Sequence, residues 1–132
     1  MIVMVNFFAK DIMIKDVHVI EVGSKVALAR LKMMRHGIGG LPVVDKNDKV
    51  VGMITLRDID LAGTDVSNLP VEDLMTTNLV KGKVDTTTKE IVELMIKTGI
   101  QRIPIIDEKG KLLGLITQTS IIKSAIAHNL LK

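Results

Sequence analysis

The chain contains two copies of one pattern, 62 residues apart (99 − 37, 114 − 52 and 73 − 11). The repeated segments pair as Gly37–Asp45 with Gly99–Asp107, Gly52–Thr55 with Gly114–Thr117, and Asp11–Met13 with Asp73–Met75. A gap-free repeat of this length is a complete supersecondary unit. We therefore expect two like units that pack face to face about a pseudo-twofold axis, with the function in the cleft they share.

The composition is that of a globular protein. Of the 132 residues, 47% are hydrophobic and 25% charged, which argues against disorder and fits one compact domain or two half-domains with a shared core. Cysteine is absent, which excludes disulfides, thiolate nucleophiles and cysteine-based metal sites and fits a cytoplasmic location. The apolar start, Met1–Val5, is too short for a membrane span and lacks the preceding basic segment of a signal peptide.

The charge pattern disfavours nucleic-acid binding without excluding it. The formal net charge is only +3, and the basic residues are spread along the chain instead of forming one long run. Aromatic residues make up 2% of the chain, so the stacking platforms of single-strand binders are missing.

Each copy reads as strand, helix, strand, strand and short helix. In the first copy, Val17–Ile20 is strand-like and Ser24 is expected to cap a helix that runs to about Arg35. Gly37 is expected to end that helix in the left-handed conformation. The buried face of the helix is predicted to carry Val26, Ala29 and Met33.

The second copy repeats this reading with clearer signals. Thr87–Glu90 has the spacing of a capping box, and Gly99 is expected to end the helix. Its buried stripe is predicted to comprise Ile91, Leu94 and Met95.

A hairpin follows the first helix in each copy. Two apolar runs flank the polar turn Asp45–Lys49, and two more flank Asp107–Lys111. Pro42 and Pro104 are expected at strand starts or edges, because proline donates no ladder hydrogen bond. The predicted class is α/β (α+β), with copies at residues 9–62 and 71–124, a linker at 63–70, an N-terminal lead-in at 1–8 and a C-terminal helix end at 125–132. The last segment, Ile121 to Lys132, is a candidate helix with Ile122, Ala125, Ile126 and Leu130 on one face, which is expected to pack on the body or against a second subunit.

The order, spacing and duplication of these motifs resemble a tandem pair of CBS domains, also called a Bateman module. The resemblance covers residues 9 to 122, nearly the whole chain. It implies two β-α-β-β-α units paired through their sheets. It also implies binding of AMP, ADP, ATP or S-adenosylmethionine in the clefts between the copies, with a shape change in response. We expect a standalone regulatory homodimer that signals to a separate effector protein, with no catalytic cofactor.

The tetrapeptide Thr55-Leu56-Arg57-Asp58 is the leading candidate site. It lies at a strand-to-helix junction, where free amide groups and the helix dipole favour an anion. A carboxylate at Asp58 can accept two hydrogen bonds from a ribose diol, and Thr55 can hold phosphate. The family resemblance implies these roles. The competing interpretation is a helix cap, with Thr55 at the N-cap and Asp58 in the first turn.

The second copy departs from this pattern. In Thr117-Gln118-Thr119-Ser120, the residue that corresponds to Asp58 is Ser120. A serine offers one hydroxyl and no charge, so we expect weaker recognition of a diol and two unequal clefts.

The resemblance also implies positions around the adenine base, although core packing is the competing interpretation for most of them. Aliphatic residues are expected to sandwich the base, and backbone groups of the first strands to read its edge. The remaining candidates are Ile38, Leu41, Pro42, Ile103 and Pro104 around the base, Val17, His18, Val19, Leu79, Val80 and Lys81 at its edge, Met13 lining a cleft, and Arg102 on phosphate or in solvent.

Other function classes receive less support. No nucleophile–base pair, phosphate loop or dinucleotide fingerprint is visible, so an enzyme is not expected. His18, His36 and His128 show no metal-ligand spacing, so no metal site is predicted. A nucleic-acid-associated protein and a structural dimer with empty clefts stay as alternatives.

Overall fold

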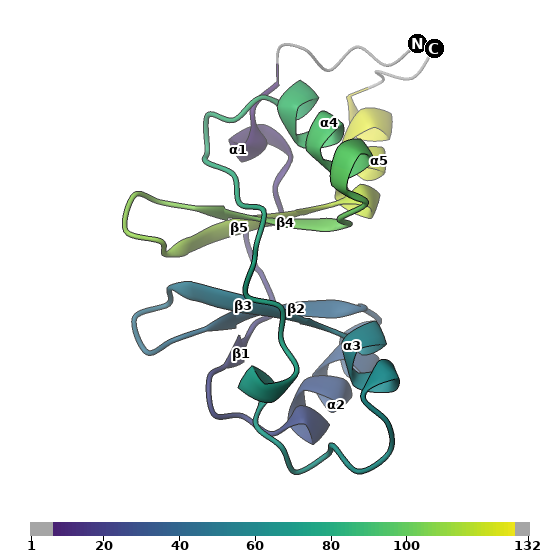
Figure 1. Ribbon diagram of the computed structural model, residues 1–132. Coiled ribbons are helices and arrows are strands. Elements are labelled where there is room, and N and C mark those ends of the chain that lie inside the picture. The colour runs from purple at the N-terminus through teal and green to yellow at the C-terminus, as the bar shows by residue number, and fades with distance from the viewer. Residues whose placement is uncertain (1–6, 129–132) are drawn as a thin grey trace. The chain divides into compact units, whose positions relative to one another are not determined.

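The computed structural model describes residues 7–128 and is a mixed α/β fold, as predicted. Its elements are α1 (Ala9–Ile12), β1 (Ile20–Glu21), α2 (Val26–His36), β2 (Gly40–Val44), β3 (Val50–Thr55), α3 (Leu56–Leu61), the 3-10 turn η1 (Val71–Asp73), α4 (Thr88–Thr98), β4 (Arg102–Ile106), β5 (Leu112–Thr117) and α5 (Gln118–Ala127) (Figure 1). Residues 1–6 of the lead-in predicted at 1–8, and the position of Leu130, lie outside the described residues.

The chain divides into two compact units that differ from the sequence copies in their boundaries. Residues 18–79 form one, here called the Asp58 unit, and residues 1–17 with 80–132 form the other, the Ser120 unit. Each lead-in joins the hairpin of the other copy. Met53 and Thr76 exchange two backbone hydrogen bonds of 2.9 Å, and Ile14 and Leu115 exchange bonds of 2.8 and 2.9 Å.

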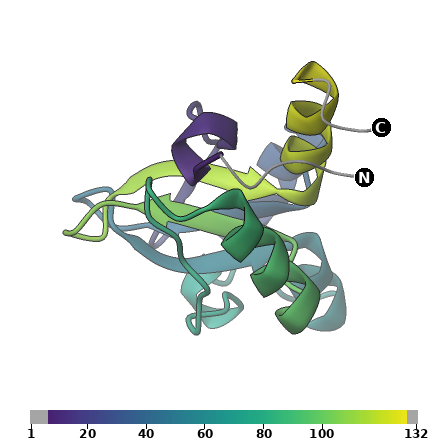
Figure 2. The same cartoon turned by 90° about the horizontal axis from the view of Figure 1, so that it is seen from above.

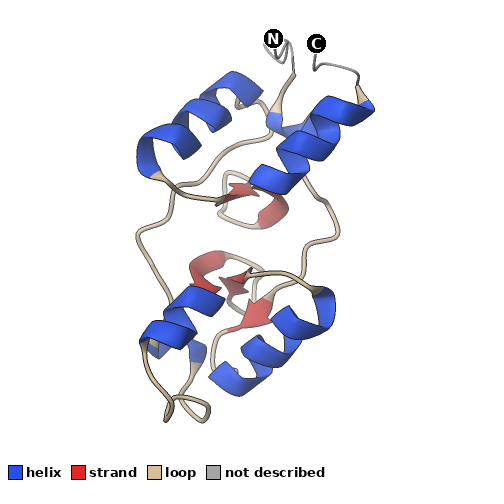
Figure 3. Ribbon diagram, turned by 90° about the vertical axis from the view of Figure 1, so that its right-hand side faces the viewer, coloured by secondary structure: helices blue, strands red, loops and turns tan. Residues whose placement is uncertain are grey.

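The Asp58 unit contains a three-stranded sheet in the order β1-β2-β3. Strand β1 runs parallel to β2, with Ile20 opposite Val43, and β2 runs antiparallel to β3, with Gly40 opposite Thr55. Helices α2 and α3 lie on one face of these strands (Figure 3). The predicted apolar face of α2 is confirmed, because Val26, Ala29 and Met33 are buried in the core.

The Ser120 unit contains the antiparallel pair β4-β5, covered on one face by α1, α4 and α5 (Figures 1 and 2). The strand expected at Leu79–Lys81 does not form. Only Gly82 bridges to β4, with one hydrogen bond to the Pro104 carbonyl and one from the Ile106 amide, both 2.9 Å. A Cβ at Gly82 would lie 2.8 Å from the Ile105 side chain, so glycine is what permits this close approach.

Pro42 lies inside β2, where its missing amide prevents a hydrogen bond to β1 but removes none to β3. Both backbone groups of Met53 bond to Thr76, on the side of β3 away from β2, so Pro42 makes a non-hydrogen-bonded pair with Met53. The missing amide of Pro42 therefore faces β1, where pairing begins only at Val43. This explains why β1 covers Ile20–Glu21 instead of the predicted Val17–Ile20, and why a proline is tolerated inside β2 and not only at its start.

The start of α2 corrects another prediction. Lys25, not Ser24, is the N-cap residue, and it makes no side-chain capping bond. Backbone carbonyls of the linker take that role, because the amides of Val26 and Ala27 donate to Leu69 and Ser67 at 2.8 and 3.0 Å. A tertiary contact has replaced the local cap.

The other helix signals are confirmed, with one exception. Gly37 and Gly99 adopt left-handed conformations with φ of 62° and 73°, and Thr87 forms the predicted capping box with Glu90. The exception is the C-terminal region, where a single helix, α5, replaces the expected short helix and separate terminal helix. Of its predicted apolar face, Ala125 is buried, whereas Ile122 and Ile126 are 57% and 65% exposed, so this face does not pack on the body as a whole, and packing against a second subunit stays a prediction.

A methionine packs on a glycine in both hairpins. A Cβ at Gly52 would lie within 3.0 Å of the Met75 sulfur, and one at Gly114 within 3.0 Å of the Met13 sulfur. Both methionines come from a lead-in, so these contacts hold each lead-in on its hairpin. Within residues 7–128, no helix is long and apolar enough to cross a membrane.

Candidate functional site

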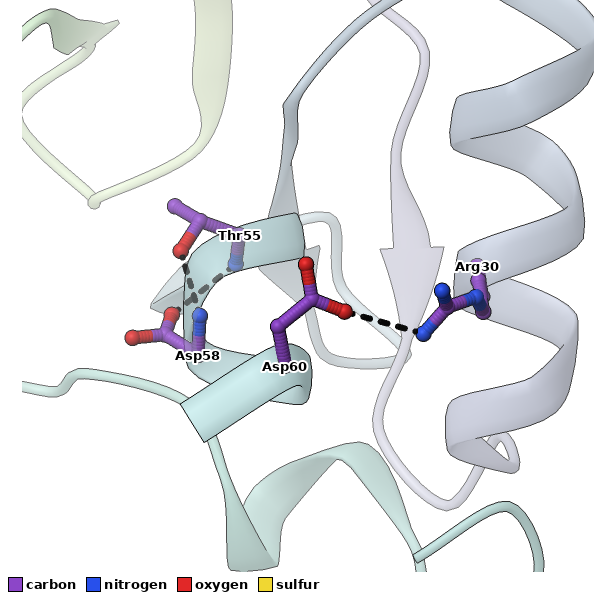
Figure 4. A network of polar contacts seen from close by, with 4 residues as sticks. All are labelled: Arg30, Thr55, Asp58 and Asp60. Carbon is purple, nitrogen blue, oxygen red and sulfur yellow. Dashed lines mark hydrogen bonds and ion pairs between the residues drawn. The ribbon is translucent and has the colours of Figure 1, made fainter. Parts of the chain in front are cut away.

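The Thr55–Asp58 segment forms a capping box where β3 passes into α3. The Thr55 hydroxyl accepts from the Asp58 amide at 3.1 Å, and Oδ2 of Asp58 accepts from the Thr55 amide at 2.9 Å (Figure 4). This reciprocal pair satisfies two amide groups at the helix end. The competing interpretation, in which Thr55 and Asp58 cap the helix, is therefore confirmed, and the ligand role stays a prediction.

The box leaves one oxygen of Asp58 unused. Oδ1 points away from Thr55 and has no hydrogen-bond or ion-pair partner in residues 7–128 (Figure 4). The side chain is half-buried, and β3 places Thr55 opposite Gly40, which adds no side chain beside it. A fixed carboxylate with a spare oxygen can accept further hydrogen bonds from a hydroxyl-bearing ligand.

The matching segment in the Ser120 unit has no such spare group. Ser120 accepts from the Thr117 amide at 2.8 Å, and its hydroxyl donates to the Thr117 carbonyl at 2.8 Å. The residue is only 8% exposed. Its one proton is therefore committed within the helix cap, and the two copies differ in what they can offer a ligand.

The candidates around a base are mainly core residues. Leu41 and Ile103 are 0% exposed and belong to the cores of their units. Pro42 and Pro104 are also buried, while Ile38 is partly buried against the core of the Asp58 unit. Core packing is sufficient to explain these apolar residues.

The segment before β1 carries an arrangement that the sequence did not reveal. The His18 ring stacks on His36, with centroids 3.7 Å apart and an interplanar angle of 15°. The Lys32 ammonium donates to the carbonyl of Val19, one of the groups expected to read a base edge. Lys32 and His36 were not predicted as site residues, because neither belongs to a repeated motif.

The remaining candidates are dispersed. Arg57 is exposed on α3, and Val17 is partly buried. In the Ser120 unit, Leu79 and Val80 are partly buried and Lys81 is exposed. Met13 packs on Gly114, and Arg102 is a half-buried residue at the start of β4, opposite Thr117.

Two further features bear on the chemistry. Arg30 and Asp60 join α2 to α3 by an ion pair of 3.1 Å, but both side chains are about half exposed, so its contribution to stability is small (Figure 4). Within the described part of the chain, no group of three or more histidine or acidic residues is placed to hold a metal ion.

Comparison with known families decides the identity of the repeat. The model of the CBS domain matches the chain twice, at residues 9–63 and 71–127. The chain belongs to the CBS-domain family. The resemblance inferred from the duplicated motifs is thereby confirmed, and the protein is a tandem CBS pair.

Curated relatives contain this CBS pair as a part of longer proteins. The chain is 38% identical over 115 residues to inosine-5'-monophosphate dehydrogenase of Methanocaldococcus jannaschii. The matched segment covers 87% of this chain but only 23% of the dehydrogenase. It is 34% identical over 96 residues to the uncharacterized protein MK0525 of Methanopyrus kandleri, covering 70% of this chain and 49% of that protein. The chain thus spans under a quarter of the dehydrogenase and about half of MK0525.

Solved CBS pairs have the same fold. The structure of CBSX2 in complex with AMP is 25% identical, with a TM-score of 0.84, and the match covers 94% of this chain and 99% of that one. The CBS domain pair of protein MJ0100, in complex with 5'-methylthioadenosine and S-adenosylmethionine, is 26% identical, with a TM-score of 0.81 and coverage of 97% and 99%. Both neighbours were crystallised with adenosine-containing ligands.

Proposed function

We propose that this CBS pair is a regulatory module that binds an adenosine-containing ligand and signals to a separate protein. The observation that carries the proposal is the state of the Asp58 carboxylate. One of its oxygens accepts from the Thr55 amide in the helix cap, and the other oxygen is unused. In this proposal, that oxygen accepts from the ribose diol, and the Thr55 hydroxyl, whose oxygen accepts from the Asp58 amide, donates its proton to the phosphate. The AMP and S-adenosylmethionine complexes of similar CBS pairs support the ligand class.

The remainder of the predicted site belongs to the same proposal. Arg102 is proposed as a phosphate ligand from the second copy, and the backbone of Val17–Val19 as the reader of the base edge. The two copies are proposed to pack through their sheets about a pseudo-twofold axis, so that the ligand lies between them. A ligand then acts by binding one arrangement of the copies better than another.

A homodimer and a regulatory role without catalysis complete the proposal. Helix α2 exposes Leu28, Leu31 and Met34 at 50%, 48% and 69%, three residues apart along one side. This apolar stripe supports association with a second copy. We propose no reaction for the chain itself, and a cytoplasmic location stays a prediction.

The test is calorimetric titration with AMP, ADP, ATP, S-adenosylmethionine and 5'-methylthioadenosine. The decisive variant is Asp58→Ser, because Ser120 shows that serine at this position still caps the helix. We expect at least one ligand to bind the wild type and to bind Asp58→Ser about tenfold or more weakly, the cost of a lost charge-assisted hydrogen bond.

The matched control is Ser120→Ala. Its affinity for the ligand should stay within about twofold of the wild-type value, well below the tenfold loss expected for Asp58→Ser. Binding that is equal in wild type and Asp58→Ser would remove Asp58 from the site. Binding of none of the five ligands would contradict the proposed function and favour a structural dimer.

A further inference from the structure

Four basic side chains gather at one end of the Asp58 unit. His18 precedes β1, while Lys32, Arg35 and His36 come from the last two turns of α2. The His18 and His36 rings stack on each other, Lys32 bonds to the Val19 carbonyl, and Arg35 neighbours His36 in the sequence. We call these four residues the basic cluster.

The basic cluster lacks a counter-charge. The ion pairs of Arg30 with Asp60 and of Lys89 with Glu93, at 3.1 and 3.9 Å, involve no member of the cluster. Loss of hydration, followed by repulsion from His18, Arg35 and Lys32, lowers the pKa of His36. The two full positive charges of the cluster are those of Lys32 and Arg35.

The fold does not require these residues. The matching positions of the second copy, 62 residues on, are Val80, Leu94, Lys97 and Thr98. Val80 and Leu94 pack against the core of the Ser120 unit. The same place in the same fold is therefore built from apolar side chains in one copy and from His18 and Lys32 in the other. At two of the four positions, those of His18 and Lys32, the second copy shows that the fold does not require a basic residue.

The geometry favours an anion over a metal ion. The two imidazole rings are nearly parallel, so their nitrogen lone pairs, which lie in the ring planes, run side by side and do not converge on one point. Lys32 and Arg35 would also repel a cation. The negative end of α2 counts for about half a charge, against the two full charges of Lys32 and Arg35.

The basic cluster lies at the same end of the sheet as Thr55. Strand β1 is parallel to β2, so the residues before Ile20 approach the start of β2, and Gly40 at that start pairs with Thr55 at the end of β3. Two strand spacings, about 10 Å, separate β1 from β3 at this end. A phosphate chain on a nucleoside can cover such a distance.

From this arrangement we propose that His18, Lys32, Arg35 and His36 form a binding site for the phosphoryl groups of a small polyanion, either free or attached to a nucleoside. Arg and Lys donate charge-assisted hydrogen bonds to phosphate oxygens, and the ring nitrogens add donors when protonated. The site does not depend on the proposed recognition of adenosine, because inorganic tripolyphosphate probes it directly.

The first experiment is a titration of the wild-type protein with tripolyphosphate, followed by the ring proton signals of its three histidines in NMR at low ionic strength, where screening is weak. We expect the signals of His18 and His36 to shift with saturation. His128, which caps α5 in the other unit, is the internal control and should stay in place. Shifts of all three histidines alike, or of none, would overturn the proposal.

The variant His18→Val/Lys32→Leu carries the residues of the second copy and should fold, since Val80 and Leu94 fill the same positions there. We expect its affinity for tripolyphosphate to fall at least fivefold by calorimetry. Arg35→Gln, at an exposed position, provides a second variant and should weaken binding at least twofold. Lys46→Ala in the exposed β2-β3 turn is the charge control. An equal loss in Lys46→Ala, or no loss in the cluster variants, would contradict the site.

Parallel titrations with ATP and adenosine identify the source of the phosphate. Tighter binding of ATP than of tripolyphosphate, lost in part in both Asp58→Ser and the cluster variants, indicates a nucleotide whose phosphate chain runs from Asp58 to the basic cluster, which would place its base away from Val17–Val19. Equal affinities indicate a free phosphate compound. Tripolyphosphate binding without any adenosine binding would contradict the proposed function and leave the basic cluster supported.

Discussion

The two units share one framework but differ in the residues that can meet a ligand. Both have a hairpin with a proline, a helix ended by a left-handed glycine, a capping box after the last strand, and a methionine packed on a glycine. The Asp58 unit adds a half-free carboxylate and the basic cluster. At the matching positions, the Ser120 unit has a serine committed to its own helix and two apolar residues. The two copies thus share the contacts that build the fold and differ at the positions proposed to bind a ligand.

Core truncation gives the largest expected effect and tests whether the frameworks are equivalent. Leu41→Ala and Ile103→Ala should each lower the free energy of unfolding by about 2–5 kcal/mol, because both side chains are fully buried. Chemical denaturation measures this. Leu61→Ala, at a position 75% exposed, is the control and should change stability by about 0.5 kcal/mol or less. If only one of these two variants lost unfolding free energy, the two units would not be equivalent in stability.

The glycine contacts come next in size. Gly52→Ala and Gly114→Ala should each cost about 1–3 kcal/mol, because the new methyl group overlaps a methionine side chain from a lead-in. Thermal unfolding of the two variants compares the units directly.

Replacing the methionine tests the cause of that loss. Gly52→Ala/Met75→Ala should be less destabilised than the sum of its single variants, because the overlap with the sulfur is gone. If the losses of unfolding free energy in the two single variants simply added up in the double variant, Met75 would not be the reason why residue 52 must be glycine.

The capping boxes should behave alike in stability although they differ in ligand chemistry. Thr55→Ala and Thr117→Ala should each cost about 1 kcal/mol, because each removes a hydroxyl that accepts an amide at a helix start. Thr→Ser at the same positions keeps the oxygen and serves as the control. We expect both variants to lose the same free energy of unfolding in denaturation, and only Thr55→Ala to lose ligand binding. That result would separate the shared role in folding from the proposed role in binding.

The smallest effect concerns the hairpin turn of the Ser120 unit. Backbone hydrogen bonds from Lys111, opposed by some desolvation and reinforced by Lys109, lower the pKa of Asp107 below its ordinary value of 3.8. The folded state therefore binds a proton less readily than the unfolded state, so this turn contributes stability above pH 3.8 that is lost as the pH falls through the lowered pKa.

Asp107→Asn should remove that pH dependence in thermal unfolding between pH 2 and 6. An unchanged slope in Asp107→Asn would show that the turn contributes nothing. Asp45→Asn alters the corresponding turn of the Asp58 unit, where Asp45 accepts from Asn47 and Lys49 at 2.8 and 3.0 Å, and shows whether the two turns behave alike.

Local signals in the sequence were sufficient for much of this fold. The helix stops at Gly37 and Gly99, the capping boxes at Thr55 and Thr87, and the buried face of α2 depend on residues close together in the chain. The repeat also pointed to the CBS family, because order and spacing are properties of the sequence itself. Asp58 stood out as a candidate because Thr55-Leu56-Arg57-Asp58 lies at a strand-to-helix junction and matches the family pattern, from which Ser120 departs.

Contacts between distant segments were decided only by the tertiary structure. The linker carbonyls that replace Ser24 as a cap, the lead-ins that pair with the other copy's hairpin, and the stack of His18 on His36 join residues at least 18 positions apart. Such contacts follow from how close the backbone brings two segments, as at Gly52 and Gly114, and periodicity along the chain carries no record of that distance. The sequence determined the repeated framework and its family, whereas the folded chain decided which polar groups are consumed by capping and which are left to bind.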